Sequence, residues 1–199
     1  TFTILILILS ILLAITIFIN MKKKETFNKH FKSKKCIVGI IGLGYIGKEL
    51  VRLLQNFNCK IIANDIEDLS YFANQHNIDI VDKNTLFRNS DIITIHTPLT
   101  DKTLRMIDLH ALKKMKKESF LINTARGGIV DETALETALN EKFIAGAALD
   151  VYEEEPAHKR SLLKLNNLIC TPHTAGNSKE AVISMGMSAI SHLINFKNQ

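Results

Sequence analysis

The sequence is poor in cysteine, and its three cysteines form no motif. Cys36, Cys59 and Cys170 lie far apart along the 199 residues and make no CxxC pair. An odd, scattered set argues against a disulfide framework or a zinc site, and it is typical of the reducing cytosol. We therefore expect a cytoplasmic protein without a metal site, in which all three cysteines are small, buried apolar residues.

Most of the chain also lacks an excess of basic charge, although the whole sequence carries a net charge of +5. Residues 21–35 hold seven of the 25 basic residues and one of the 20 acidic residues, which leaves 18 basic and 19 acidic residues in 36–199. A nearly neutral folded part gives no sign of nucleic-acid binding. We expect no nucleic-acid partner and interpret residues 21–35 as a basic linker.

Charged side chains are missing altogether from residues 1–20. Residues 2–19 are apolar except for three hydroxyl residues, and such a run is about long enough to cross a bilayer as a helix. The lysines at 22–24 would then leave the following domain facing the cytoplasm, tethered to the membrane. Another interpretation is an artefact, in which the run is translated upstream sequence and the start lies at Met21. A signal peptide is disfavoured, because the charge follows the apolar run and no cleavage site is present.

No internal repeat or low-complexity linker interrupts residues 36–196, where short apolar runs alternate with helical periodicity. The predicted strands are 36–41, 60–64, 79–81, 91–96, 119–124, 144–150 and 168–170. The predicted helices are 45–57, 69–76, 84–87, 109–115, 131–141 and 178–196. Asp131 and Ser178 are the predicted caps of the last two, and the final helix has an apolar stripe of Ala181, Ile183, Met187, Ile190, Leu193 and Ile194. This alternation predicts one α/β domain, a Rossmann-type doubly wound parallel sheet.

A glycine-rich loop joins the first predicted strand to the first predicted helix. It contains Gly42, Gly44 and Gly47 in a GxGxxG pattern, and Asp65 ends the second strand. The three glycines would permit a tight turn, close approach of a pyrophosphate and close packing of the helix on the strand. Asp65 would accept hydrogen bonds from the adenosine ribose and repel a 2′-phosphate. The loop and the carboxylate together predict binding of NAD rather than NADP.

Three further groups of residues follow predicted strands, and doubly wound sheets bind ligands at the carboxyl ends of their strands. Thr97 and Pro98 follow one strand, and Arg126, which can grip a carboxylate with two hydrogen bonds, follows the next. His173 follows the last strand, and a histidine with a carboxylate such as Glu155 nearby is the simplest acid–base pair at neutral pH. Taken singly, these residues also fit a strand exit, a surface salt bridge and a plain loop histidine.

In this order, the segments resemble the NAD-binding domain of the D-isomer-specific 2-hydroxyacid dehydrogenases, a phosphoglycerate dehydrogenase-like family. The matching stretches are IIGLGYIGKEL, HTPLTDKT, INTARGGIVDETAL, AALDVYEEEP and TPHTAG, within residues 36 to about 196. The resemblance implies an NAD-dependent oxidoreductase that acts on the CH–OH group of a small 2-hydroxy acid. It also implies a homodimer, which nothing in the residues themselves indicates.

The same resemblance implies roles for individual residues. His173 would be the catalytic acid–base group, Glu155 its carboxylate partner, and Arg126 the residue that binds the substrate carboxylate and polarises the reacting carbonyl. The implied contacts to NAD come from Gly42, Gly44, Tyr45, Ile46, Gly47, Asp65, Thr97, Pro98, Thr124, Ala125, Arg126, Asp150, His173, Thr174, Ala175 and Gly176.

Two departures from the family pattern affect these expectations. Tyr45 stands where the family often has arginine, so one charged phosphate contact is absent. The family's substrate domain, built from about the first hundred residues and the C-terminal helix, is largely missing, and with it domain closure over a substrate. We therefore expect NAD(H) binding with weak or absent turnover. A non-catalytic NAD(H)-sensing interaction protein stays open as an alternative, although the presence of Arg126, Glu155 and His173 favours an enzyme.

Overall fold

The computed structural model describes residues 36–57, 59–158 and 160–197. The predicted apolar segment of residues 1–20 and the predicted basic linker of residues 21–35 lie outside the described residues, so both stay predictions. Within the described ranges, none of the helices combines the length and the apolar character that crossing a membrane requires.

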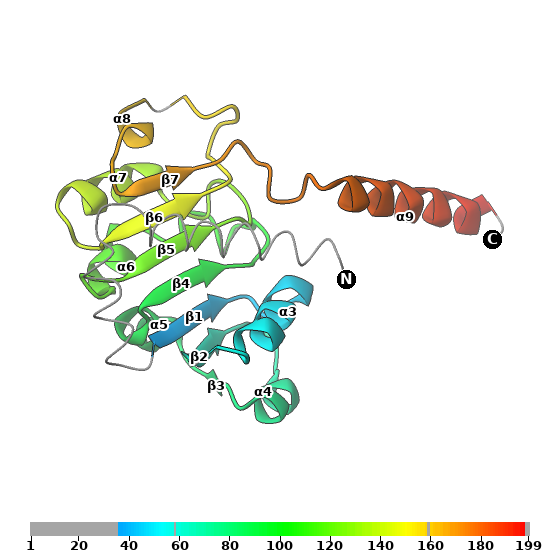
Figure 1. Ribbon diagram of the computed structural model, residues 1–199, viewed down its shortest axis with the longest axis horizontal. Helices are drawn as coiled ribbons and strands as arrows, with labels where there is room; N and C mark the ends of the chain where they lie inside the picture. Colours follow the sequence, from blue (N-terminus) through cyan, green and yellow to red (C-terminus); the bar gives the residue numbers. More distant parts are fainter. Residues whose placement is uncertain (1–35, 58, 159, 198–199) are drawn as a thin grey trace.

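A parallel sheet of seven strands forms the centre of the described domain (Figure 1). The strand order is β3-β2-β1-β4-β5-β6-β7, and every neighbouring pair is parallel. The strands are β1 (Cys36–Ile41), β2 (Cys59–Asn64), β3 (Asp79–Ile80), β4 (Ile92–Ile95), β5 (Phe120–Asn123), β6 (Gly146–Leu149) and β7 (Leu168–Cys170). The chain winds outward from β1 in both directions, which confirms the predicted doubly wound fold. The strand order reverses between β1 and β4, the point at which doubly wound sheets bind ligands.

Helices cover both faces of the sheet. The helices of the described ranges are α3 (Tyr45–Leu54), α4 (Ser70–His76), α5 (Lys83–Asn89), α6 (Leu109–Lys114), α7 (Glu132–Asn140), α8 (Arg160–Leu163) and α9 (Lys179–Lys197). The side chains of Asp82, Asp108 and Asp131 cap α5, α6 and α7 by accepting hydrogen bonds from first-turn N–H groups, which confirms the predicted cap at Asp131. The single-turn helix α8 was not predicted, since four residues carry no recognisable period.

Two large apolar cores lie on opposite faces of the sheet, and a third, small cluster contains Ile92, Ile122 and Ala148. Ile40 packs with α3 and α4, whereas its neighbour Ile41 packs with α5, α6 and α7. Successive strand residues point to opposite faces, so a strand buried on both sides is apolar at every position. This is why the continuous apolar run of β1 predicts a central strand correctly.

The three cysteines are only partly buried, so the expectation of full burial is wrong. None of them forms a disulfide. Burial raises the pKa of the Cys36 thiol to about 12 and also raises the pKa of the Cys170 thiol. Both groups are therefore neutral thiols at physiological pH, with the low reactivity that this entails.

Helix α9 extends away from the sheet (Figure 1). Its start matches the prediction, because the Ser178 hydroxyl accepts a hydrogen bond from the Ala181 N–H at 3.0 Å. Ala181 is buried, but the apolar side chains that continue the predicted stripe, from Ile183 to Ile194, are more than half exposed. The periodicity thus identifies a helix correctly, while the stripe does not pack on the described domain.

Candidate active site

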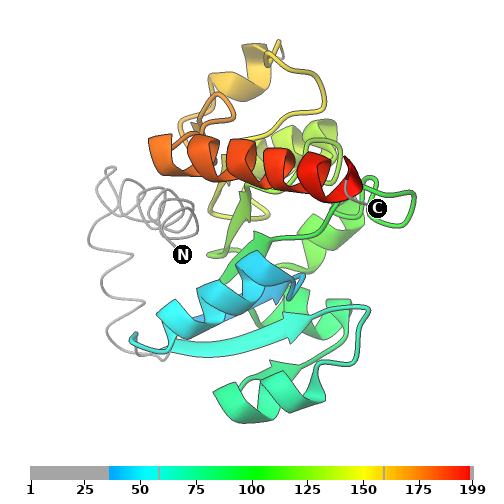
Figure 2. The same ribbon diagram turned by 90° about the vertical axis from the view of Figure 1, so that its right-hand side faces the viewer.

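The predicted site residues come from loops at the carboxyl edge of the sheet and from the first turn of α3, which contains Tyr45, Ile46 and Gly47. Figure 2 looks onto this edge, from which the glycine loop, the loops after β4, β5 and β6, and the turn after β7 emerge. The edge brings together residues that are up to 134 positions apart in sequence, from Gly42 to Gly176. Parallel strands share one carboxyl edge, and this geometry gathers the loops.

The three glycines of the loop are required for different reasons. Gly42 has φ +97°, and a Cβ atom there would lie 2.6 Å from the His96 carbonyl oxygen. A Cβ atom on Gly47 would overlap the Gly42 carbonyl oxygen. Around Gly44, in contrast, a Cβ atom would meet no protein atom within 4 Å. Packing therefore explains the first and third glycines, and the open space beside the second leaves room for a ligand at the start of α3.

Asp65 lies directly after β2 and already holds the glycine loop. Its carboxylate accepts hydrogen bonds from the Leu43 N–H at 2.6 Å and the Glu67 N–H at 3.0 Å. A carboxylate has about four lone-pair sites, so it can still accept from ribose hydroxyls. The next residue, Ile66, is 93% exposed, and the sequence analysis did not predict it as a site residue. Its position directly after Asp65 was a signal for an apolar contact with the adenine ring of the cofactor.

Two buried hydroxyl groups at this edge have no hydrogen-bond partner in the part of the chain that the structure describes. They belong to Thr97, after β4, and Thr124, after β5. A buried polar group without a partner costs about 1–3 kcal/mol, so such groups are normally satisfied in the functional state. Both were predicted to contact the cofactor. Together with the space beside Gly44, they show that the residues present fit a polar, phosphate-bearing ligand.

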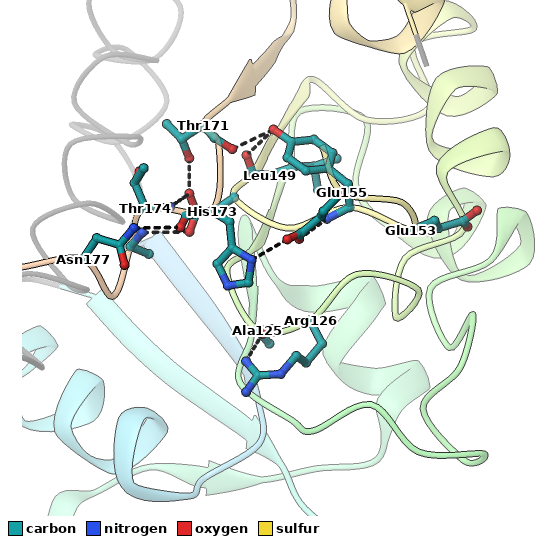
Figure 3. Close-up of polar contacts among 12 residues, drawn as sticks. Ala125, Arg126, Leu149, Glu153, Glu155, Thr171, His173, Thr174 and Asn177 are labelled. Carbon is teal, nitrogen blue, oxygen red and sulfur yellow. Dashed lines mark hydrogen bonds and ion pairs between the residues drawn. The ribbon is translucent and has the colours of Figure 1, made fainter. Parts of the chain in front are cut away.

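His173 and Glu155 form an ion pair across the edge (Figure 3). His173 Nδ1 lies 2.7 Å from Glu155 Oε2, and the side chains are 50% and 37% exposed. The hydrogen bond from His173 lowers the pKa of Glu155, helped by the Tyr152 N–H and the charge of Arg126. Because Nδ1 is engaged, Nε2 is the ring nitrogen left for a substrate. His96, by comparison, is no acid–base candidate, since burial lowers its pKa to about 4.

Arg126 comes from the loop after β5, on the same side of the site (Figure 3). Its Nη1 donates to the Ala125 carbonyl oxygen at 2.6 Å, and the side chain is exposed. The buried Asn123 fixes this loop by accepting from the Ala125 N–H at 3.1 Å and donating to the Arg126 carbonyl at 3.0 Å. The guanidinium is therefore presented from a rigid loop, with further N–H groups for an anion.

Asp150 fixes the turn after β7, a structural role that the sequence analysis did not predict. The side chain is only 3% exposed, and its carboxylate accepts hydrogen bonds from the Thr171 hydroxyl at 2.5 Å, the Thr174 N–H at 2.9 Å and the Ala175 N–H at 2.8 Å. It thereby fixes the turn on which His173 sits with φ +52°. Its predicted contact with the cofactor stays a prediction.

Tyr152 is a second unpredicted support of the same turn. Its buried hydroxyl lies 3.2 Å from the Leu149 carbonyl oxygen and 2.9 Å from that of Thr171, which links the exits of β6 and β7. Burial raises the pKa of Tyr152 well above its ordinary value, so the phenol stays a donor. Its position before the three glutamates Glu153, Glu154 and Glu155 is the only sequence signal that marks it.

Comparison with known proteins gives consistent matches. The family model for the D-isomer specific 2-hydroxyacid dehydrogenase NAD binding domain matches residues 7–175, a range that starts inside the apolar segment. The glyoxylate reductase of Thermofilum pendens is 44% identical over 161 residues, which are 79% of this chain and 47% of that protein. The D-3-phosphoglycerate dehydrogenase of Archaeoglobus fulgidus is 40% identical over 158 residues, 79% of this chain and 30% of that protein.

Solved structures show the same similarity. The D-lactate dehydrogenase of Lactobacillus jensenii, solved with NAD⁺, has a TM-score of 0.75 and 31% identity, covering 82% of this chain and 53% of that one. The NAD-complexed D-isomer specific 2-hydroxyacid dehydrogenase of Lactobacillus delbrueckii has a TM-score of 0.74 and 30% identity, with the same coverage. The chain thus spans about a third to a half of the length of the curated relatives that it matches.

Proposed function

Because this chain belongs to the D-isomer-specific 2-hydroxyacid dehydrogenase family through its NAD-binding domain, we propose that it exchanges a hydride between NAD(H) and a small 2-hydroxy or 2-keto acid. The observation that carries the proposal is the His173–Glu155 pair, with 2.7 Å between Nδ1 and Oε2, beside the Arg126 loop at the ligand-binding edge. The presence of all three residues favours an enzyme over a non-catalytic NAD(H)-sensing interaction protein.

The cofactor would lie along the carboxyl edge. The backbone N–H groups at the start of α3 suit a pyrophosphate, and Asp65 suits the ribose of NAD. The Thr97 and Thr124 hydroxyls, which have no partner among the described residues, would gain hydrogen bonds from the bound dinucleotide. Tyr45, Ile46, Pro98, Ala125, Asp150 and residues 173–176 would complete the site. When bound, NAD(H) supplies or accepts the hydride.

Arg126 and His173 would act on the acid. The Arg126 guanidinium would leave the Ala125 carbonyl and bind the substrate carboxylate with two parallel hydrogen bonds. His173, held through Nδ1, would donate a proton from Nε2 to the carbonyl oxygen during reduction and take it back during oxidation. Glu155 would stabilise the charged imidazole and hold it in one orientation.

The names of the relatives support a substrate class, since they include enzymes named for glyoxylate, glycerate and 3-phosphoglycerate. We therefore propose a 2-keto acid of two or three carbons, with or without a phosphate. As the resemblance implies, we further propose a homodimer located in the cytoplasm. Sedimentation velocity and cell fractionation of the native protein test these two proposals, including a membrane tether.

A direct test compares NADH oxidation by the wild type and by His173→Gln with a panel of small 2-keto acids. The expected result is weak turnover by the wild type, its loss in His173→Gln, and NADH binding by both. His110→Gln, which changes an exposed histidine on α6, is the matched control and should behave as the wild type. Equal activity of the wild type and His173→Gln would reject the proposed role of His173. NADH binding without turnover by the wild type would support the sensing alternative.

A further inference from the structure

Glu132 and Glu153 are linked in a reciprocal pair of hydrogen bonds. Glu132 is the first residue of α7 and is only 8% exposed. Its Oε1 accepts from the Glu153 N–H at 2.7 Å, while Glu153 Oε1 accepts from the Glu132 N–H at 3.3 Å. We refer to these two bonds as the Glu132–Glu153 clasp. It joins the start of α7 to the loop that follows β6.

The clasp holds one particular peptide group, between Tyr152 and Glu153. The Tyr152 N–H donates to Glu155 Oε1 at 3.2 Å. On the other side, the Tyr152 carbonyl lies directly against the backbone of Gly127, where a Cβ atom would overlap the carbonyl oxygen. The Tyr152 N–H belongs to the preceding peptide group, so Tyr152 contacts the Glu155 carboxylate through its own N–H and the Arg126 loop through the carbonyl of the held peptide.

Arg105 connects a third loop to the same place. Its backbone N–H donates to the Gly128 carbonyl oxygen at 2.7 Å, and its Nε lies 4.0 Å from Glu153 Oε1. The positive charge offsets part of the repulsion between the carboxylates of Glu132 and Glu153. The clasp is thus braced by the loop after β4 as well.

We propose that Glu132 is a positioning residue, which sets the distance between Arg126 and the His173–Glu155 pair by fixing the Tyr152–Glu153 peptide. The inference rests on the proposed function, in which Arg126 holds the carboxylate of a small acid and His173 reaches its adjacent carbonyl. These two groups of a 2-keto acid are joined by a single bond, so the two protein loops must keep one spacing. A misplacement of about 1 Å costs about 10²-fold in rate.

Three substitutions test the role of Glu132. Glu132→Ala removes the acceptor of the Glu153 N–H, and we expect kcat to fall by about 10²-fold while NADH affinity is unchanged. Glu132→Gln keeps an oxygen that can accept the same hydrogen bond, so it should recover most of the activity. Glu141→Ala removes the same charge from the exposed far end of α7 and should behave as the wild type.

A second readout is independent of turnover. The pKa of Glu155 lies below its ordinary value because it accepts hydrogen bonds from His173 and from the Tyr152 N–H. When the Tyr152–Glu153 peptide moves, these bonds weaken and the pKa of Glu155 rises. Carboxyl ¹³C NMR titration should detect this rise in Glu132→Ala but not in Glu132→Gln or Glu141→Ala.

The outcomes separate this inference from the proposed function. Wild-type kcat in Glu132→Ala, or an equal loss in Glu132→Gln and Glu132→Ala, would overturn the positioning role. If Glu132→Ala does not fold, Glu132→Asp takes its place. The aspartate side chain is shorter by one methylene group, so it should pull the Tyr152–Glu153 peptide out of position, lower kcat and raise the pKa of Glu155. If the wild type reduces no 2-keto acid, the proposed function fails, and an unchanged Glu155 titration would then overturn the clasp on its own.

Discussion

The open space beside Gly44 leads to a prediction in which cofactor binding and stability respond separately. In Gly44→Ala, the new methyl group meets no protein atom within 4 Å, and the backbone at φ −66° and ψ −160° suits alanine. Alanine is a poorer helix cap than glycine, which destabilises the fold, but it also lowers the conformational entropy of the unfolded chain, which stabilises it. Because the two effects oppose each other, the free energy of unfolding should stay within about 1 kcal/mol of the wild type.

NADH binding should respond strongly, because the methyl group fills the space that a pyrophosphate must enter. A hydrogen bond between a charged group and a backbone N–H contributes about 1.5–3 kcal/mol. Loss of one such bond weakens binding by about 10- to 100-fold, since about 1.4 kcal/mol corresponds to a factor of ten. Isothermal titration calorimetry with NADH and thermal unfolding of the same samples measure both quantities.

Two matched variants control the experiment. Gly186→Ala, on exposed α9, also meets no atom within 4 Å and should leave NADH binding unchanged. Gly47→Ala should destabilise the fold itself, because its Cβ atom would overlap the Gly42 carbonyl oxygen. NADH affinity of Gly44→Ala equal to that of the wild type would refute the placement of the pyrophosphate beside Gly44. Unfolding of Gly44→Ala would refute the inference that a Cβ atom at this position meets no protein atom.

Three other predictions concern the carboxylates of the site. Asp150→Ala should destabilise the protein by about 3 kcal/mol or more in urea unfolding, because three donors lose their buried acceptor. An unchanged free energy of unfolding would contradict the inference that Asp150 fixes the turn that carries His173. The pKa of Glu155 is lowered from 4.5, so the stability contributed by its bond to His173 should be complete above that pH and disappear as pH falls through the folded value. Melting temperatures of wild type and Glu155→Gln should therefore converge in acid, and a constant difference would count against the bond. Asp65→Asn, which removes the charge, should reduce the preference for NADH over NADPH in fluorescence titrations, and an unchanged preference would show that another residue selects the cofactor.

The sheet could be predicted because its strands leave a local signal. Residues buried on both faces are apolar at every position, and each run ends where the chain reaches the loop edge, as at Ile41 and Ile95. The structure shortens the predicted runs 91–96 and 144–150 to Ile92–Ile95 and Gly146–Leu149. The trimmed ends include the polar residues Asp91, His96 and Asp150, so composition alone does not locate the last residue of a strand.

The supports of the site could not be predicted, because they join residues far apart in sequence. Asp150 accepts from residues 21 to 25 positions away, and Glu132 meets Glu153 across 21 positions. No local period encodes such pairs, and only the fold brings them together. In the same way, the pattern of α9 identifies an amphipathic helix but does not say whether its apolar stripe is covered.

The most direct test of the account follows the hydride itself. NADH deuterated at nicotinamide C4 is incubated with hydroxypyruvate, the keto acid of glycerate, and the product is analysed by mass spectrometry and chiral chromatography. We predict deuterium at C2 of D-glycerate for the wild type and none for His173→Gln, although both bind NADH. Absence of label in the wild-type product, or equal labelling by the two proteins, would contradict the account.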